Sequence, residues 1–570
     1  MPSNTQTTLT PAKPNSSSEN VLKAAGAMGA ATFLSRILGL VREQAFAILF
    51  GAGNATDAFI VAFRIPNLLR DLFAEGAMSA SLVPTFTRTE SEEGQRRAWR
   101  VAGLVFRVLF FTALVIAVLG MIFSSQLVEL YASAFHAVPG KFELTVRMTR
   151  LMFPFFPLVA LAAAFMGILN ARGKFFVPAF SSALFNLTSI AVGVTCALVL
   201  FRWGPGIGIQ PIEGMAIGVL AGGITQAFSQ LPTLYGTGYR WQPRTGEDPA
   251  WHRDPRLRQM LWMMVPGTLG LAATQINILV NTILATSQGP GAVSWLGYSF
   301  RLMQFPIGIF GVSLASATLP RISRQWVEHD LGALQATLSQ SLRRVLAVNL
   351  PASAGLAFLG YPIIQLIFQY GRFSTNDTQA TALALAMYAI GLTAYSAVKV
   401  LVPACYAVGN TRIPVISSVL AVAVTIILNV LMVKPFGYWG LALGTSIAAI
   451  LNAAFLLKAL QRLIRAGGGD FPIFPLIRSF VEHFAVALAM GGICFLSYLG
   501  LEKLLPDDFF MVQFGSSALP VSRAIKVGFL VSEGVLVVIL LARILRLKDT
   551  TEAVDLFIRN VKNKLRPGRT

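Results

Sequence analysis

Long apolar stretches, separated by short polar or charged loops, recur along nearly the whole 570-residue chain. A helix needs about 20 mostly apolar residues to cross the hydrocarbon core of a bilayer, and we expect about 14 such segments here. They lie near residues 24–50, 56–87, 101–122, 145–170, 178–201, 214–235, 259–285, 292–320, 341–368, 379–405, 412–433, 438–460, 481–502 and 522–546. Only 13% of the residues are charged, against about 25% in soluble domains. The sequence therefore predicts an all-α polytopic membrane protein.

The positions of the 46 lysines and arginines predict its orientation. Most of them lie in the two terminal tails and in the loops after even-numbered segments, and short cytoplasmic loops carry such an excess. We therefore expect a multi-pass membrane protein with both termini in the cytoplasm. Because the net charge of +20 is spread between apolar segments and forms no groove-lining patch, nucleic-acid binding is not predicted.

Three sequence matches, recurring in order at a nearly constant offset, indicate an internal duplication. The clearest is Gly173-x-x-x-x-Pro178-x-x-Ser181-Ser182, repeated as Gly409-x-x-x-x-Pro414-x-x-Ser417-Ser418. The others pair Phe63-Arg64 through Pro84 with Phe300-Arg301 through Pro320, and Gly214–Gly218 with Gly440–Gly444. Each match shifts the chain by six segments, which preserves orientation and predicts two parallel six-helix lobes plus two C-terminal helices. Chance recurrence of Gly, Ser and Pro in a helical bundle is the alternative.

This duplication suggests a division of the chain into lobes, linkers and tails. The expected parts are a disordered cytoplasmic tail (1–20), an N-lobe (21–235), a cytoplasmic linker (236–258), a C-lobe (259–460), a second cytoplasmic linker (461–480), the last two transmembrane helices (481–546) and a basic cytoplasmic tail (547–570). Residues 559–569 of the last part are expected to lie against the anionic leaflet. Parallel repeats of this kind form transporters with substrate sites near the midplane.

Charged residues also lie inside the predicted spans, where each unpaired charge costs at least about 2.5–3.5 kcal/mol. They are Arg36, Arg42, Glu43, Asp57, Arg64, Arg70, Asp71, Glu75, Arg107, Arg301 and Lys399. So many charges must face protein or water. Residues seven or eleven positions apart share a helix face, which groups Arg64 with Asp71 and Glu75, and Arg36 with Glu43. For each of these residues, an internal ion pair and a ligand role are both open.

Three arginines have no carboxylate on their own helix face: Arg42, Arg70 and Arg301. A guanidinium is permanently charged and binds phosphate oxygens through two parallel hydrogen bonds, so a cluster of arginines suits a phosphorylated or pyrophosphorylated substrate. Arg107 and Lys399 are weaker candidates. Arg107 lies near a basic loop and can extend to the interface, while Lys399 can pair with a carboxylate of the second segment.

Neither a metal site nor an enzyme active site is predicted. The cysteines lie singly in apolar segments, without metal-ligand spacing: Cys196, Cys405 and Cys494. The histidines are scattered and are expected on the surface or in loops: His136, His252, His329 and His483. A lipid-linked glycosyltransferase would need an acid/base or metal constellation at a membrane face. We therefore expect a transporter without a cofactor.

Several runs resemble a known transporter family. They are Ser35-Arg36-Ile-Leu-Gly39-Leu-Val-Arg42-Glu43, Phe50-Gly51-Ala-Gly53, Thr56-Asp57-Ala58-Phe59, Phe63-Arg64-Ile-Pro66-Asn67-Leu68-Leu69-Arg70, Phe73-Ala74-Glu75-Gly76-Ala77, Val83-Pro84, Arg301-Leu-Met-x-Phe305-Pro306, Phe368-Gln369-Tyr370-Gly371-Arg372-Phe373 and Tyr406-Ala407 before Pro414. Over essentially its whole length the chain resembles the MurJ (MviN) family of lipid II flippases, within the multidrug/oligosaccharidyl-lipid/polysaccharide exporter superfamily.

The resemblance implies alternating access. A central cationic cavity built from segments 1, 2, 7 and 8 would take the pyrophosphate and sugars of lipid II, and a groove by segments 13 and 14 the lipid tail. By position, the family's essential arginines correspond to Arg36, Arg42, Arg70 and Arg301, and its essential acid to Asp57. The other charges in segments 1, 2 and 10 are then expected to form a conformational ion network: Glu43, Arg64, Asp71, Glu75 and Lys399.

Two departures from the family pattern bear on coupling. Many relatives have acidic residues near the arginine of segment 8, where this chain has Phe300 and Gln304. Some members bind sodium through carboxylates in segments 7 and 11, and neither segment has one here. A sodium site is thus not supported by the sequence, and we expect membrane potential, worth about 2.3 kcal/mol per charge per 100 mV, to drive transport.

Other functions remain alternatives. Within the superfamily these are a flippase for another polyprenyl-pyrophosphate-linked oligosaccharide and a multidrug exporter, although exporters of cationic drugs need acidic cavity residues. A non-transporting membrane scaffold for cell-wall synthases belongs to another class, and it would leave the arginines inside the spans unexplained. The expected partners are lipid II, membrane lipids and cell-wall synthesis proteins.

Overall fold

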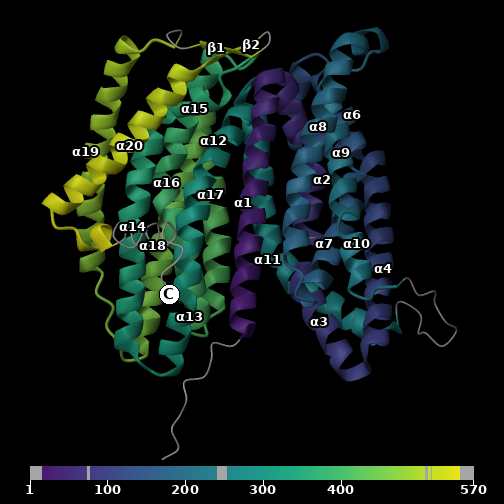
Figure 1. The fold of residues 1–570 in the computed structure, drawn as a ribbon, viewed down its shortest axis with the longest axis horizontal. Helices are drawn as coiled ribbons and strands as arrows, with labels where there is room; N and C mark the ends of the chain where they lie inside the picture. The colour runs from purple at the N-terminus through teal and green to yellow at the C-terminus, as the bar shows by residue number, and fades with distance from the viewer. Residues whose placement is uncertain (1–15, 74–76, 241–252, 508–510, 515–516, 553–570) are drawn as a thin grey trace, which may run out of the picture. The chain divides into compact units, whose positions relative to one another are not determined.

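The computed structural model describes residues 16–73, 77–240, 253–507, 511–514 and 517–552, and nearly all of them are helical (Figure 1). The helices are α1 (Ser16–Phe50), α2 (Asn54–Phe73), α3 (Ala77–Glu93), α4 (Gln95–Ile122), α5 (Ser124–Ala132), η1 (Ser133–Ala137), α6 (Lys141–Met152), α7 (Phe155–Ala171), α8 (Phe176–Ile207), α9 (Glu213–Phe228), α10 (Leu231–Gly236), α11 (Pro255–Thr286), α12 (Ala292–Pro306), η3 (Ile307–Gly311), α13 (Val312–Val327), α14 (Leu331–Phe358), α15 (Gly360–Phe368), α16 (Thr375–Ala407), α17 (Arg412–Phe436), α18 (Tyr438–Ala466), α19 (Phe474–Leu504) and α20 (Val521–Ile544). The all-α fold class is confirmed.

Each predicted segment coincides with one helix or with consecutive helices. Nine described helices or helix pairs are long and apolar enough to cross a membrane, or ten when the bent pair α14–α15 is taken as one span. Of the remaining segments, those on α1, α2–α3 and α11 are interrupted by charged, polar or helix-breaking residues, and α9 is short. The chain is therefore a multi-pass membrane protein, and the number 14 stays a prediction.

Several predicted spans are broken where a proline or glycine interrupts the hydrogen-bond ladder. The eighth segment passes at Pro306 from α12 into the π-helical turn η3 before α13 continues. The ninth bends by 70° between α14 and α15. Proline has no N–H to donate, and bending of this kind is tolerated where neighbouring helices satisfy the freed backbone groups.

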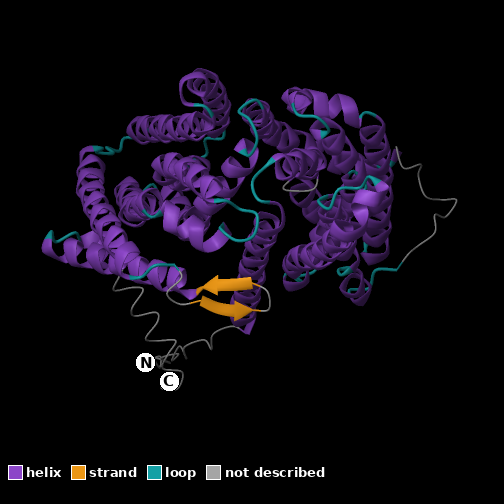
Figure 2. Cartoon of the chain, turned by 90° about the horizontal axis from the view of Figure 1, so that it is seen from above, coloured by secondary structure: helices purple, strands orange, loops and turns teal. Residues whose placement is uncertain are grey.

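One β-hairpin was not expected from the sequence. Strand β1 (Met511–Phe514) pairs antiparallel with β2 (Ser517–Pro520), with Met511 opposite Pro520 (Figure 2). Each strand has only four residues, too few for the alternating pattern by which a strand is recognised in a sequence.

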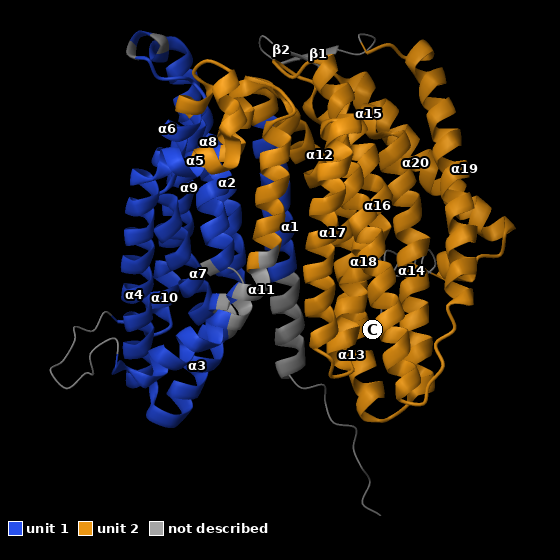
Figure 3. Ribbon diagram, turned by 180° about the vertical axis from the view of Figure 1, so that it is seen from behind, with its two compact units in different colours: residues 1–45, 62–127, 145–271 blue, residues 46–61, 128–144, 272–570 orange. Residues whose placement is uncertain are grey.

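The chain forms two compact units (Figure 3). Unit 1 consists of residues 1–45, 62–127 and 145–271, and unit 2 of residues 46–61, 128–144 and 272–570. A core cluster in unit 1 joins α3, α4 and α7, with Phe86, Trp99 and Phe165 among its buried side chains. In unit 2, one cluster joins α13, α14, α16 and α18, and another joins α14, α19 and α20.

The Gly-x-x-x-Gly repeat pairs consecutive helices in both copies. A Cβ on Gly218 of α9 would lie 2.5 Å from the carbonyl oxygen of Ser189 on α8, so the two backbones touch. In the second copy, a Cβ on Gly444 of α18 would collide with the side chain of Asn429 on α17. Small residues at such positions allow membrane helices to pack closely, and the shared arrangement supports the predicted duplication.

Candidate functional site

Arg42 occupies an aromatic pocket in unit 1. Its side chain is 10% exposed, and its guanidinium carbon lies 5.9 Å from the ring centre of Phe63 on α2 and 5.7 Å from that of Phe185 on α8. Its Nη2 atom donates to Oε1 of the adjacent Glu43 at 3.2 Å. Cation–π contacts and one acid partner thus stabilise a charge that would otherwise be costly to bury.

Arg70 on α2 makes a similar pair. Its Nε and Nη2 atoms donate to Oδ1 of Asp71 at 3.2 and 2.9 Å, and Asn67 donates to the other carboxylate oxygen at 3.4 Å. The expectation that Arg42 and Arg70 lie apart from carboxylates was wrong. Helical phase places the Cα atoms of adjacent residues on different faces, but the long arginine side chain reaches its immediate neighbour.

Two further candidates of unit 1, Arg36 and Arg64, lie on the same helices. Arg36 is exposed on α1, and its predicted partner Glu43 pairs with Arg42 instead. Arg64 is half-buried on α2. Glu75 lies outside the described residues.

Asp57 is completely buried in unit 2 and caps a helix other than its own. Its Oδ2 accepts from the backbone N–H of Gly291 at 2.7 Å, and its Oδ1 accepts from the N–H and hydroxyl of Ser294 at 3.0 and 2.7 Å. Gly291 is the N-cap residue of α12 and has no side chain to satisfy the first N–H groups of that helix. The carboxylate of Asp57 does so instead, and its charge is favourable at a helix N-terminus.

Lys141, which the sequence analysis missed, compensates the charge of Asp57. Its Nζ lies 3.2 Å from Oδ2 of Asp57 and 4.0 Å from the ring centre of Phe135, and its side chain is 3% exposed. Lys141 lies at the edge of the fourth segment, in the run Val138-Pro-Gly-Lys-Phe142, where a lysine is typical of a solvated loop. The sequence does carry a signal for the capping role of Asp57. Gly289-Pro-Gly291, followed by Ser294, begins the eighth segment without a capping side chain at Gly291, so the start of that helix needs a cap from another part of the chain.

Helix α12 carries Arg301 and is fixed to α16 by two hydrogen bonds. The indole N–H of Trp295 donates to Oδ1 of Asp377 at 2.9 Å, and the hydroxyl of Ser299 donates to the carbonyl oxygen of Thr381 at 2.7 Å. The Arg301 side chain is exposed, and Lys399 is exposed near the other end of α16.

A neutral pair joins α11 to α17. The amide of Asn429, fully buried, donates to the side-chain oxygen of Asn281 and, at 3.4 Å, to the hydroxyl of Thr445. These helices correspond to the predicted segments 7 and 11, neither of which contains an Asp or Glu. Among the described residues, no group of three or more His, Cys, Asp or Glu side chains could hold a metal ion.

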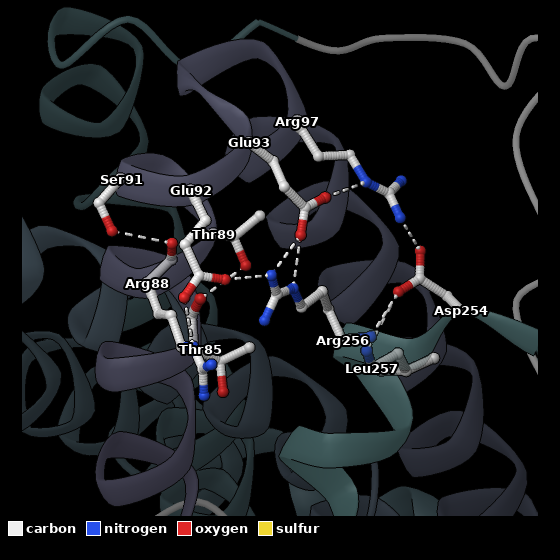
Figure 4. A network of polar contacts seen from close by, with 10 residues as sticks. All are labelled: Thr85, Arg88, Thr89, Ser91, Glu92, Glu93, Arg97, Asp254, Arg256 and Leu257. Carbon is white, nitrogen blue, oxygen red and sulfur yellow. Dashed lines mark hydrogen bonds and ion pairs between the residues drawn. The ribbon is translucent and has the colours of Figure 1, made fainter.

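Within unit 1, ion pairs hold the start of α11 against the turn between α3 and α4 (Figure 4). Asp254 caps α11 by accepting from the N–H of Arg256 at 2.9 Å, and its other oxygen accepts from Arg97 at 2.7 Å. Arg256 donates to Glu92 and Glu93, both at 2.6 Å. Hydrogen bonds from Arg88 and Arg256 lower the pKa of Glu92. These ion pairs thus fix the start of α11 to the turn between α3 and α4.

In unit 2, an ion cluster ties α20 to α15 and to the end of α19. Asp507 accepts from Lys526 at 2.6 Å, from Arg523 at 2.8 Å and from Gln365 at 2.9 Å. Lys526 is 2% exposed and also donates to Glu502 at 3.0 Å. The charges of the last two helices therefore stabilise their attachment to the rest of the unit.

We expect Asp507→Asn to lower the thermal unfolding midpoint at pH 7 but much less below about pH 4. Burial raises the pKa of Asp507, but hydrogen bonds from Lys526 and Arg523 outweigh it and hold the pKa below the ordinary 3.8. A lowered folded-state pKa adds stability above the unfolded-state pKa, and this stability is lost as pH falls through the folded-state pKa. Unfolding of the detergent-solubilised protein at both pH values measures the difference. Asp470→Asn, on a carboxylate 77% exposed, is the control, and an equal deficit at both pH values would contradict the prediction.

One histidine expectation is corrected. His483 is 2% exposed within α19; it donates from Nδ1 to the carbonyl oxygen of Ser479 at 2.7 Å, and its Nε2 lies 2.9 Å from the hydroxyl of Thr550. It is thus a buried structural residue that ties α19 to the segment after α20. His136 is exposed as expected, and His252 lies outside the described residues.

Comparison with known proteins identifies the family of the chain. The family model "Lipid II flippase MurJ" matches residues 46–515. A lipid II flippase MurJ of Burkholderia cenocepacia is 34% identical over 475 residues, which cover 83% of this chain and 89% of that protein. A probable lipid II flippase MurJ of Vibrio cholerae is 34% identical over 451 residues, covering 78% of this chain and 83% of that protein.

Solved structures show the same fold. A lipid II flippase MurJ in an inward closed conformation superposes with a TM-score of 0.72 at 25% identity, covering 91% of this chain and 98% of that one. An inward-facing multidrug resistance MATE family transporter of the MOP superfamily gives a TM-score of 0.64 at 14% identity, covering 78% and 99%. The chain therefore shares its fold with these two transporters, and it belongs to the lipid II flippase MurJ family.

Proposed function

We propose that this protein is a flippase that moves lipid II from the cytoplasmic to the periplasmic leaflet of the inner membrane by alternating access. The observation that carries the proposal is family membership over most of the chain, at 34% identity to a lipid II flippase. Both termini lie in the cytoplasm in this proposal, and the surrounding membrane lipids and cell-wall synthesis proteins are its partners.

The pyrophosphate is bound by Arg36, Arg42, Arg70 and Arg301 in this proposal. Two of these arginines hold an adjacent carboxylate: Arg42 pairs with Glu43 and Arg70 with Asp71. A pyrophosphate carries more charge than a carboxylate and accepts the same paired hydrogen bonds, so it can replace these acids on the guanidinium groups. The exchange allows Arg42 and Arg70 to be paired both with and without substrate.

The other charged residues of the spans then switch partners or hold the helices in place. Glu43 and Asp71 are released when substrate binds, and Arg64, Glu75 and Lys399 belong to the same ion network. Asp57 acts at a distance from the pyrophosphate by capping α12, the helix that presents Arg301. Its role in this proposal is to fix that helix in one state of the cycle.

Membrane potential drives the cycle in this proposal, without sodium or another cofactor. Support comes from the neutral pair of Asn281 and Asn429, which joins two helices that carry sodium-binding carboxylates in some relatives. An amide pair has no net charge to attract a cation.

The triple variant Arg42→Gln, Arg70→Gln, Arg301→Gln is expected to lose all complementation of a flippase-depleted strain. Glutamine keeps hydrogen-bonding capacity but removes the charge that pairs with phosphate. The control is Arg88→Gln, Arg465→Gln, Arg478→Gln, which removes the same charge from side chains 58%, 58% and 73% exposed. Growth is scored at matched membrane expression. Normal growth of the first triple variant would refute the proposed binding site.

A further inference from the structure

The turn between α1 and α2 is enclosed by two other loops of unit 2. The backbone N–H of Arg372, in the loop between α15 and α16, donates to the carbonyl oxygen of Ile48 at the end of α1 at 3.0 Å. On another side, the start of α12 lies against the same turn, since a Cβ on Gly291 would come within 2.9 Å of the carbonyl oxygen of Ala52. Inside the turn, the hydroxyl of Thr56 donates to the carbonyl oxygen of Gly51 at 2.8 Å.

Three glycines permit this contact, and each has a positive φ. Gly51 (φ 68°) faces the loop after α15, where a Cβ would lie 2.5 Å from the carbonyl oxygen of Arg372. Gly371 (φ 59°) faces back, and a Cβ there would collide with the carbonyl oxygen of Ile48. Gly291 (φ 90°) completes the set from α12. The colliding atoms at Gly51 and Gly371 are backbone, which cannot rotate away as a side chain can.

We propose that Gly51, Gly291 and Gly371 are positioning residues for transport, because they let three backbones meet and hold this end of unit 2 closed. The contact lies next to Asp57, whose carboxylate accepts from the N–H of Gly291. It joins a turn of the first repeat to two loops of the second repeat. The inference rests on the proposed function, since alternating access requires the repeats to part at this end and meet again in every cycle.

The surroundings of Gly51 and Gly371 distinguish them from other glycines that also have a positive φ. Gly140 has a φ of 76° and belongs to the same unit, but a Cβ there would meet nothing within 4 Å. Alanine at Gly140 therefore adds the strain of a left-handed residue alone, in every conformation of the transporter. Alanine at Gly371 or Gly51 adds an overlap that exists only while the turn and the loop are in contact.

The test compares Gly371→Ala and Gly51→Ala with Gly140→Ala. Cys196, Cys405 and Cys494 are first replaced by alanine, and Ala58, fully buried beside Asp57, is changed to cysteine in a chain shown to support growth. Labelling of Cys at position 58 by a membrane-impermeant maleimide then reports opening. We expect Gly371→Ala and Gly51→Ala to raise the labelling rate about tenfold, the population shift that corresponds to losing one buried hydrogen bond. Both variants should also lose complementation, while Gly140→Ala changes neither readout.

Labelling rates for Gly371→Ala and Gly51→Ala equal to that of Gly140→Ala would overturn the proposal. If the alanine variants do not accumulate, hydrogen exchange of the unmodified protein decides. The Arg372 amide should exchange about tenfold faster during turnover with lipid II than without it, and an unchanged rate would overturn the proposal as well. The labelling assay needs no substrate, so it stays informative even if the arginine triple variant grows normally and the proposed function fails.

Discussion

Asp57→Asn is expected to abolish complementation of a flippase-depleted strain while the protein still accumulates in the membrane. Both oxygens of Asp57 act as acceptors, one toward Lys141 and Gly291 and the other toward Ser294. Asparagine has one acceptor oxygen, so its NH₂ group must face a donor. The substitution also leaves the buried ammonium of Lys141 without its counter-charge, and breaking a buried pair from one side costs about 3–5 kcal/mol.

A double variant separates charge from geometry. Adding Lys141→Gln to Asp57→Asn removes the unpaired ammonium, so we expect it to restore thermal stability but not growth, because the cap of α12 stays incomplete. Asp254→Asn is the matched control, since Asp254 is also a buried capping aspartate with a cationic partner but caps its own helix, α11, with a cost of about 1 kcal/mol. Growth of the Asp57→Asn strain at the rate of the Asp254→Asn strain would contradict the role given to Asp57.

Most of the fold could be predicted because the membrane constrains it strongly. Apolar length places each predicted segment on a helix, and the Gly-x-x-x-Gly repeat lies where α9 packs on α8 and α18 packs on α17. The breaks within spans, such as the 70° bend after Phe358, are less predictable. A proline or glycine permits a break, but the packing of neighbouring helices decides whether and how far the helix bends.

The sequence identifies the charged residues inside the spans but not the pairs that they form. Arg42 and Asp57 stand out because a charge inside a span needs a reason. Helical phase did not predict the pair of Arg42 with Glu43. It considers only the direction in which each Cα faces, whereas the long arginine side chain reaches the adjacent residue. Lys141 could not be found from a span at all, since its partner Asp57 is distant in the sequence and only the tertiary fold brings them together.

Collapse of the membrane potential at constant pH is expected to slow translocation of labelled lipid II about 50-fold per 100 mV for each charge that crosses the full field. The positive charge of the arginines determines why the potential speeds transport and its collapse slows it. An inside-negative potential draws the empty cationic site toward the cytoplasm, and it no longer opposes outward movement of the site once the pyrophosphate has neutralised the charge. The potential therefore drives the return of the empty site, which is the transport direction of the cycle.

Vesicles containing the protein and fluorescent lipid II provide the measurement. Valinomycin with graded potassium sets the membrane potential, and nigericin removes only the pH gradient. The translocation rate should therefore change with the potential set by valinomycin and stay the same after nigericin is added. Replacing sodium by choline should leave the rate unchanged, because the amide pair of Asn281 and Asn429 has no net charge to attract a cation. The variant Asn281→Asp, Asn429→Asp places acids at that position. Another gradient drives the cycle if the translocation rate of the unmodified protein does not change with the membrane potential. The same conclusion follows if the rate is lower in choline than in sodium.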